Sequence, residues 1–406
     1  MKENETPMVF NASAARHPIP CPNFGLIINS FRAALRRFPS SGATLVFGVL
    51  TVVWLAAMTP CQALPEFSRQ YGVGCQTCHS IAPRLNPVGL AFQANHFNWT
   101  GEGAPHQKSW RDALPVSNLD TVSVEHSATE HHTATNLDEV TFYLARGFRL
   151  GNGRPAGFFA ETLAYSTQAD GRSGDLGNAF VALPLAGRSG QLAVVAGQFT
   201  PLRYQYDPVN SLTDTLPLSL ADDFNGFTFT DPVPGVRLDW FDGRGKGTAD
   251  GNYLTVGVPF EGHLALNNDA SVHRQHGVFA HAFHRRGYAT VGAFGFTHAG
   301  QHLEGLLGTH ELRDNLYVLG VAARGQDDSG STQRLSGEVE YVFSPRLALT
   351  GRLEARQDAA RGPEQGHAAV AAMTYYPFKR AIWRVTAETR QRAGDRALTL
   401  FVRAQF

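Results

Sequence analysis

Two cysteines and a histidine stand at a spacing that can support redox chemistry, in the run Cys75-Gln76-Thr77-Cys78-His79. The thiols of Cys75 and Cys78 can form thioethers to the vinyl groups of a haem, and His79 can then bind the iron axially. A bare C-x-x-C is also compatible with a redox dithiol or with half of a zinc site. The zinc site needs a second ligand pair, and the sequence has no other C-x-x-C. The dithiol expects a thioredoxin-like βαβ context, which is absent. The run therefore predicts one covalent haem c, with His79 as the proximal ligand, provided that the chain is exported.

The second axial position of the iron has no obvious methionine. Methionine is the usual distal partner in small cytochromes c, but beyond residue 63 the chain has only Met373, far from the motif. His96 and His106 are the nearby candidates, and His96 is close enough in sequence to fold over the ring. The alternative is a solvent-facing or lumen-facing histidine, in a chain with 16 histidines. His96 is the candidate distal ligand.

Length and charge bound the class of protein. The chain has 406 residues, enough for two or more ordinary domains or for one large barrel. Lysine plus arginine and aspartate plus glutamate both total 35, so the formal net charge is zero. This balance argues against a nucleic-acid binder, which would show a basic excess. The remaining cysteines, Cys21 and Cys61, precede the motif, so their removal with a signal segment would leave only the haem pair.

Residues 1–63 have the features of a signal peptide with an extended N-terminal region. The apolar run from Ala43 to Met58 is short for a spanning helix and suits a signal-peptide core. Cys61-Gln62-Ala63 then offers small residues at the positions that a signal peptidase recognises. We expect cleavage after Ala63 and a mature chain that starts at Leu64. An uncleaved inner-membrane anchor is the alternative.

We expect residues 64–112 to form a monohaem cytochrome c segment around this motif. A segment of roughly fifty residues buries too little surface to be stable alone, so it needs a cofactor or another domain to pack against. Apolar residues from Ile81 to Phe92 recur at spacings near three and four, which predicts a short amphipathic helix. Pro83 and Pro87 interrupt the pattern, so we expect two turns and then the helix.

From about Leu119 onward the apolar period changes to two. Segment 334–343 places Leu335, Val339 and Phe343 on one side of a strand and Ser336, Glu338 and Glu340 on the other. Segments 139–150, 346–356 and 397–406 alternate in the same way, which predicts half-buried strands. A soluble β-sandwich would also fit. Segments of about ten residues, a charged polar side and an aromatic end at Phe406 instead favour a transmembrane outer-membrane β-barrel over 113–406.

The alternation predicts sixteen antiparallel strands, with fourteen or eighteen as alternatives. Their expected ranges are 119–127, 139–150, 156–166, 176–186, 190–199, 235–241, 252–262, 274–285, 288–299, 302–311, 314–324, 333–343, 346–356, 366–376, 381–391 and 397–406. Short turns such as 344–345 belong on the periplasmic side, and longer polar loops such as 325–332 belong outside. Residues 242–252 are long for a periplasmic turn and count against this scheme. The polar faces predict a charged lumen in which Arg352, Glu354, Arg384 and Glu388 pack against each other or against the haem segment.

Two further stretches carry charge or metal ligands. The expected extracellular loop Thr200–Pro234 holds Asp207, Asp214, Asp222, Asp223 and Asp231 but only one basic residue, Arg203. Such a loop can draw cations toward a pore, or it can be a solvated loop without a role. Segment His263–His310 holds eight histidines. They lack the spacing of a metal site, so polar lining is the preferred interpretation.

The flanks of the motif resemble a known family. Pro65-Glu66-Phe67-Ser68-Arg69-Gln70-Tyr71 precedes the motif and Pro83-Arg84-Leu85-Asn86-Pro87-Val88-Gly89 follows it. These runs are similar to those of the fused cytochrome–porin family, in which a monohaem segment precedes an outer-membrane barrel and whose best-known members are iron oxidases. The chain departs from the family with Val88 in place of the usual Phe, and with Asn95-His96-Phe97 in place of the usual Asn-Gly-Tyr.

The resemblance implies outer-membrane electron transfer. An extracellular donor, Fe(II), would be oxidised, and the electron would pass by way of haem c to a periplasmic cytochrome c, with the barrel wall in contact with outer-membrane lipid. Outward transfer to extracellular acceptors is one alternative, and a transport porin with a haem-bearing plug is another. We expect the haem segment to enter the lumen from the periplasmic side, tethered by a linker over 107–118.

Overall fold

The computed structural model belongs to a mainly β protein. The residues that it describes are 66–74, 77–81, 84–99, 105–109, 115–127, 132–165, 175–186, 191–202, 212–213, 217–221, 227–244, 249–260, 277–313, 315–327, 330–344, 346–358, 366–377, 383–392 and 395–405. The expected signal region, Cys75 and Phe406 lie outside this set. The described residues belong to one compact unit, Leu64–Phe406. No helix in the described part of the chain is long and apolar enough to cross a membrane.

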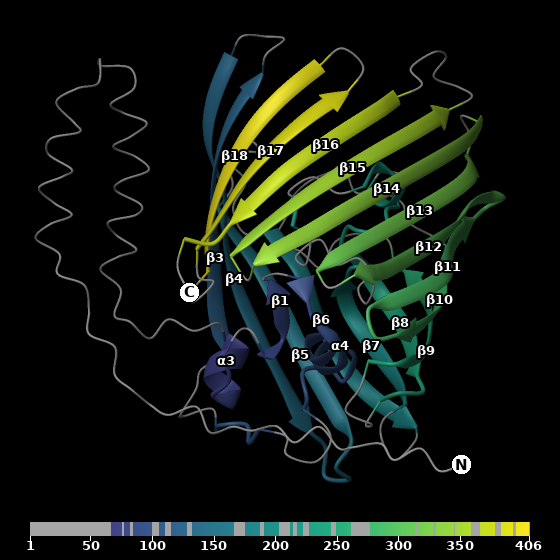
Figure 1. Cartoon of the computed structure of the whole chain (residues 1–406). Helices are drawn as coiled ribbons and strands as arrows, with labels where there is room; N and C mark the ends of the chain where they lie inside the picture. Colours follow the sequence, from purple (N-terminus) through teal and green to yellow (C-terminus); the bar gives the residue numbers. More distant parts are fainter. Residues whose placement is uncertain are drawn as a thin grey trace, which may run out of the picture. The chain divides into compact units, whose positions relative to one another are not determined.

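Sixteen antiparallel strands form a closed barrel, in which each strand pairs with its neighbour in sequence and β18 closes on β3 (Figure 1). The strands are β3 (Val116–Ser127), β4 (His132–Arg149), β5 (Pro155–Tyr165), β6 (Asp175–Ala186), β7 (Leu192–Phe199), β8 (Val233–Phe241), β9 (Gly251–Pro259), β10 (Val278–Arg286), β11 (Ala289–His298), β12 (Gln301–Arg313), β13 (Leu316–Asp327), β14 (Gly330–Ser344), β15 (Leu347–Asp358), β16 (Gly366–Tyr375), β17 (Trp383–Arg392) and β18 (Asp395–Gln405). The predicted strand number is therefore confirmed.

The predicted division of each strand into two faces is also confirmed. On β14 the side chains of Leu335 and Val339 are 58% and 50% exposed, because they lie on the outer face of the barrel. Glu338 and Glu340, on the inner face, are buried. Closure of the sheet leaves no unpaired strand edge, and the outer face carries aliphatic side chains. A lipid environment requires both features.

Several connections differ from the expected ones. The first hairpin is longer, because the polar residues from His132 onward, which show no apolar alternation, pair with the end of β3. The expected loop 325–332 is mostly strand, since β13 and β14 pair as far as Asp327 and Gly330. The two ends of the connection 242–252, which counted against the scheme, are hydrogen-bonded to each other: the backbone N–H of Asn252 donates to Asp242 Oδ1 at 2.8 Å.

The segment before the barrel contains α3 (Glu66–Tyr71), the short paired strands β1 (His79–Ile81) and β2 (Arg84–Leu85), and α4 (Pro87–Ala94). The helix after the motif is thus confirmed, whereas the first expected turn is a two-stranded hairpin. The start of α4 follows from its sequence. Pro87 stands in the first turn, where its missing N–H is not needed, and Asn86 Oδ1 accepts from the N–H of Gly89 at 3.0 Å.

The interior of the barrel differs from the expected charged lumen, because only part of the inner face is charged. Most buried charges lie on β14, β15 and β17, and others lie on β4, β8 and β10, among them the Arg237–Asp239 pair. Elsewhere the interior holds an apolar cluster that joins rings of the N-terminal segment, the wall and the β7–β8 connection; its phenylalanines are Phe92, Phe97, Phe159, Phe180, Phe199, Phe227, Phe229, Phe279, Phe294 and Phe296. Phenylalanines that alternate with glycine and alanine, as in 292–296, were the signal in the sequence.

The connection between β7 and β8 turns inward rather than remaining an external loop. Its described parts include α5 (Leu218–Ala221), which contacts β13, β14 and β15. Ser219 Oγ lies 2.7 Å from Ser336 Oγ on the inner face of β14. Phe227 is fully buried and stacks on Phe296 of β11, with ring centroids 4.0 Å apart. Of its five aspartates, only Asp231 is among the described residues.

Candidate functional site

The described residues of the motif are Thr77, Cys78 and His79, which follow α3 in the chain, and His79 begins β1. Cys78 and His79 are half-buried, and His79 pairs with Leu85 of β2. The carbonyl of Cys78 accepts from the N–H of Asn86 at 2.9 Å, and Asn86 Nδ2 donates to the carbonyl of Thr77 at 3.1 Å. A Cβ atom at Gly89 would collide with the Cys78 carbonyl oxygen, so α4 packs directly on the motif backbone. Asn86 thus caps α4 and fixes the motif at the same time.

An aromatic cluster stands beside the motif, formed by Phe67 and Tyr71 of α3, Phe92 of α4, and the following Phe97 and Trp99. Phe67 meets Phe92 edge-on at 5.0 Å and stacks on Phe97 at 4.9 Å between centroids. Phe97 continues onto Phe159 of β5, at 5.9 Å. This continuity makes the segment part of the barrel's interior core rather than a separate body.

A left-handed turn seats the segment on the barrel wall. His96 and Phe97 follow α4 with φ of 53° and 62°. Their carbonyl oxygens lie against Gly157 and Gly147, where a Cβ atom would collide with them. Gly147 and Gly157 face each other across β4 and β5. This glycine pair is a recess in the wall that admits a backbone and no side chain.

Polar contacts hold the segment to β3, β4 and β5. Gln70 Nε2 donates to the carbonyl of Ala145 at 2.8 Å, and Asn98 Nδ2 donates to the carbonyl of Ala156 at 2.8 Å. Arg69 donates to the carbonyl of Val116. Glu66 is buried beside them, and this burial raises the pKa of its carboxyl group, against the lowering effect of a hydrogen bond with Ser117 and of the Arg69 charge.

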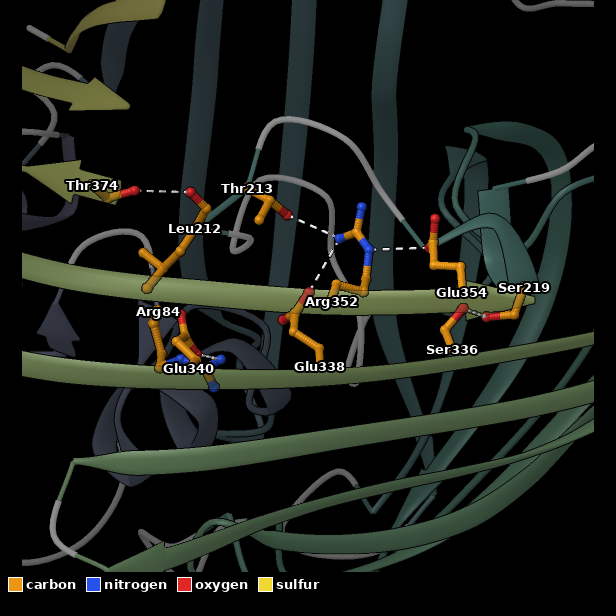
Figure 2. Close-up of polar contacts among 10 residues, drawn as sticks. All are labelled: Arg84, Leu212, Thr213, Ser219, Ser336, Glu338, Glu340, Arg352, Glu354 and Thr374. Atoms are coloured by element: carbon orange, nitrogen blue, oxygen red, sulfur yellow. Dashed lines mark hydrogen bonds and ion pairs between the residues drawn. The ribbon is translucent and has the colours of Figure 1, made fainter. Parts of the chain in front are cut away.

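Two further sides of the wall are in contact with the segment. The guanidinium of Arg84 pairs with the Glu340 carboxylate on β14 (Figure 2). It also lies 4.7 Å from the ring centroid of Tyr317 on β13. Ala94 belongs to a cluster with inward-facing aromatics of β8, β9 and β10, namely Phe241, Tyr253 and Phe283. The segment therefore contacts β3–β5, β8–β10 and β13–β14.

The candidates for the distal haem ligand differ in position. His96 is buried, with 3% of its surface exposed, so it does not face solvent, and the alternative of a lumen-facing histidine that binds no iron stays open. His106 is exposed, and Met373 is 48% exposed on the outer face of β16. Of the three, only His96 is buried, and its ligation stays a prediction.

Other expected groups are only partly brought together. Arg352 pairs with Glu354 at 3.0 Å and with Glu338 at 3.1 Å, which confirms the expected packing for Arg352 and Glu354. Arg384 and Glu388 are buried on β17, as expected of lumen residues. In the described part of the chain, no group of three or more His, Cys, Asp or Glu side chains could hold a metal ion. His281, within the histidine-rich segment, instead contacts the Pro201 carbonyl through Nε2 at 3.0 Å. The roles of Gly147, Gly157 and Arg84 were not predicted, because none has a local sequence signal.

Comparison with known proteins defines the fold. No protein-family model matches the chain, and neither does any curated protein sequence. Among solved structures, the barrel is similar to OmpF of Salmonella typhi in complex with daunomycin, with a TM-score of 0.56 and 13% identity over 72% of this chain and 98% of that one. It is also similar to an anion-selective porin of Comamonas acidovorans (0.54, 12%, 72% and 99%) and to the outer-membrane channel DcaP of Acinetobacter baumannii (0.52, 12%, 72% and 97%). The chain has the fold of the outer-membrane porins.

Proposed function

We propose that this protein transfers electrons across the outer membrane, with a haem c attached to a segment that closes a porin-like barrel. The donor is extracellular, Fe(II) by the family resemblance, and the acceptor is a periplasmic cytochrome c. One observation carries the proposal: the segment with the C-x-x-C-H motif contacts inward-facing residues on three sides of the barrel. An ordinary aqueous pore has no use for a redox motif in that position.

The residues around the motif fit a haem c in their chemistry. Cys78, together with Cys75 outside the described residues, would form the thioethers, and His79 would be the proximal ligand. The aromatic cluster of Phe67, Phe92 and Phe97 offers an apolar surface beside these groups. A haem bound there supplies a one-electron redox centre whose potential depends on axial ligands, burial and solvent exposure.

The chain's own residues would hold that centre in position. Gln70 and Asn98 fix the segment to β4 and β5 through uncharged hydrogen bonds, and Arg84 fixes it to β14 through an ion pair. Apolar packing continues from the segment into the wall through Phe97 and Phe159. The exposed aliphatic side chains on the outer face would contact outer-membrane lipid.

A second function is supported by the fold itself. The solved structures that resemble this barrel include channels and porins. A transport porin with the segment as its plug would use the same contacts, and the haem would then serve structure or sensing. The two functions differ in what happens when a donor is added and when a voltage is applied.

The first experiment measures haem content and reduction in the purified full-length protein. We expect one covalent haem by mass and by haem staining after denaturation, and its loss in a Cys78→Ala variant. Anaerobic addition of Fe(II) should produce the ferrous haem spectrum rapidly. Absence of covalent haem, or failure of Fe(II) reduction at every pH tried, would reject the electron-transfer function. A haem-containing protein that Fe(II) does not reduce, but that opens under voltage, would favour the plugged porin.

A further inference from the structure

The inner face of β14–β16, which we call the shared wall, contacts two separate parts of the chain. Inward residues alternate along β14 in the order Ser336, Glu338, Glu340 and Val342, with about 7 Å between successive ones because a strand rises about 3.4 Å per residue. All four are buried. Figure 2 shows this wall with the residues that reach it.

The β7–β8 connection occupies one part of the shared wall. Ser219 Oγ meets Ser336 Oγ at 2.7 Å, and Thr213 Oγ1 accepts from Arg352 Nη1 at 3.1 Å. The carbonyl of Leu212 accepts from Thr374 Oγ1 of β16 at 3.0 Å. Arg352 is itself held between Glu338 and Glu354, so its orientation toward the connection is fixed (Figure 2).

The N-terminal segment occupies the adjacent part of the same wall. Arg84 reaches Glu340, the next inward residue after Glu338, and its guanidinium lies over the ring of Tyr317. Arg84 is 27% exposed at its side chain and Glu340 only 2%. Loss of Arg84 would leave a buried carboxylate without its counter-charge, which is strongly destabilising.

The two parts meet at the end of this row. Ile81, from the hairpin that follows the motif, and Leu212, from the β7–β8 connection, are 2% and 3% exposed. They belong to one apolar cluster with Tyr317 of β13, Val342 and Ala348 of the wall, and Tyr376, which follows β16. Truncation of either side chain would leave a cavity in the cluster that both share.

We propose that the shared wall couples the β7–β8 connection to the motif segment, so that each is held more tightly when the other is in place. The carriers are the Arg84–Glu340 pair and the cluster around Ile81 and Leu212. An event that draws the connection off the wall then loosens the segment that bears the motif. This inference rests on the proposed closure of the barrel by the segment. It adds that this closure depends on the position of the β7–β8 connection.

The first test is a charge exchange in the full-length protein, with single-channel conductance in planar bilayers as the measurement. Arg84→Glu and Glu340→Arg should each raise the fraction of time spent open at least fivefold. The double exchange should return within about twofold of the wild type, because the pair is restored in reverse. Arg324→Glu is the matched control, since Arg324 pairs with Glu304 at 2.6 Å between exposed side chains of β12 and β13, whereas the shared wall is an inner face. That variant should conduct like the wild type.

The second test measures coupling through a cycle of Leu212→Ala, Arg84→Gln and the double variant. We expect the combined change in the open-to-closed ratio to differ from the product of the single changes by about fivefold or more, as coupled sites do. A product that matches the double variant would overturn the coupling. Single exchanges that leave the open fraction unchanged, with folded barrels, would overturn the role of Arg84. A wild type that conducts fully would instead reject the closure itself.

Discussion

The glycine pair in the wall gives the sharpest test of how the motif segment is seated. Replacement of Gly157 by alanine places a Cβ atom against the His96 carbonyl oxygen and 3.2 Å from His96 Cβ. Both neighbours belong to a left-handed turn whose backbone cannot rotate away easily, since φ is already 53° at His96 and 62° at Phe97. Overpacking of this kind costs about 1–3 kcal/mol. That range shifts the equilibrium between seated and released segment by roughly five- to 150-fold.

Limited proteolysis of the full-length protein can measure that shift. Trypsin should cut after Arg69 and Arg84 only when the segment leaves the wall, and the cleavage rate should follow the released population when release is fast. Gly337→Ala on the outer face of β14 is the matched control, because its Cβ would meet no atom within 4 Å. Both substitutions lower the conformational entropy of the unfolded chain to the same extent, which is worth about 0.4–1 kcal/mol of stability in each variant. Equal cleavage of the two variants, with both barrels intact, would refute the proposed seat.

Three further predictions use other residues of the same region. Burial raises the pKa of Glu66, so the folded state favours the protonated carboxyl group. We therefore expect the segment's melting temperature to fall as pH rises from about 4.5 through the raised pKa. Glu66→Gln should flatten that pH dependence. Phe97→Ala should destabilise the seated segment by about 3–5 kcal/mol, because it removes a ring packed on both Phe67 and Phe159, and protease sensitivity will show whether it does. His96→Ala should change the ferric haem spectrum, whereas Met373→Leu should not, because Met373 lies on the outer face; unchanged spectra in both would exclude His96 as a ligand.

The strands were predictable because a barrel wall imposes one simple rule on the sequence. Residues such as Leu335 and Glu338 lie on opposite faces of the wall, one outer and one inner. The alternation of apolar and polar residues therefore predicts both that a segment is a strand and which face points outward. The start of α4 was predictable for a similar reason, since proline and a capping side chain act locally. The ends of the strands were less predictable. The polar residues near His132 pair with the end of β3, and no local pattern identifies that partner.

The organisation of the site could not be read from the sequence in the same way. Arg84 and Glu340 are far apart in the chain, and only closure of the barrel makes them partners. Gly147 and Gly157 resemble many other glycines until the backbone of His96 and Phe97 is placed against them. The inward course of the β7–β8 connection depends on Ser219 and Thr213 finding hydroxyl and guanidinium partners across the lumen. Each is a property of tertiary contact rather than of spacing.

The junction of β18 with β3 has a consequence for biogenesis. The segment that bears the motif runs directly into β3, and β3 is the strand on which the last strand closes. The segment touches walls that are completed only at that moment. If a haem is attached to Cys75 and Cys78, as proposed, the attaching enzyme needs access to the motif, and contacts of the segment with the closed wall would restrict that access. We therefore expect attachment to precede closure, and the order of synthesis, with the motif first and the closing strand last, would provide the interval for it.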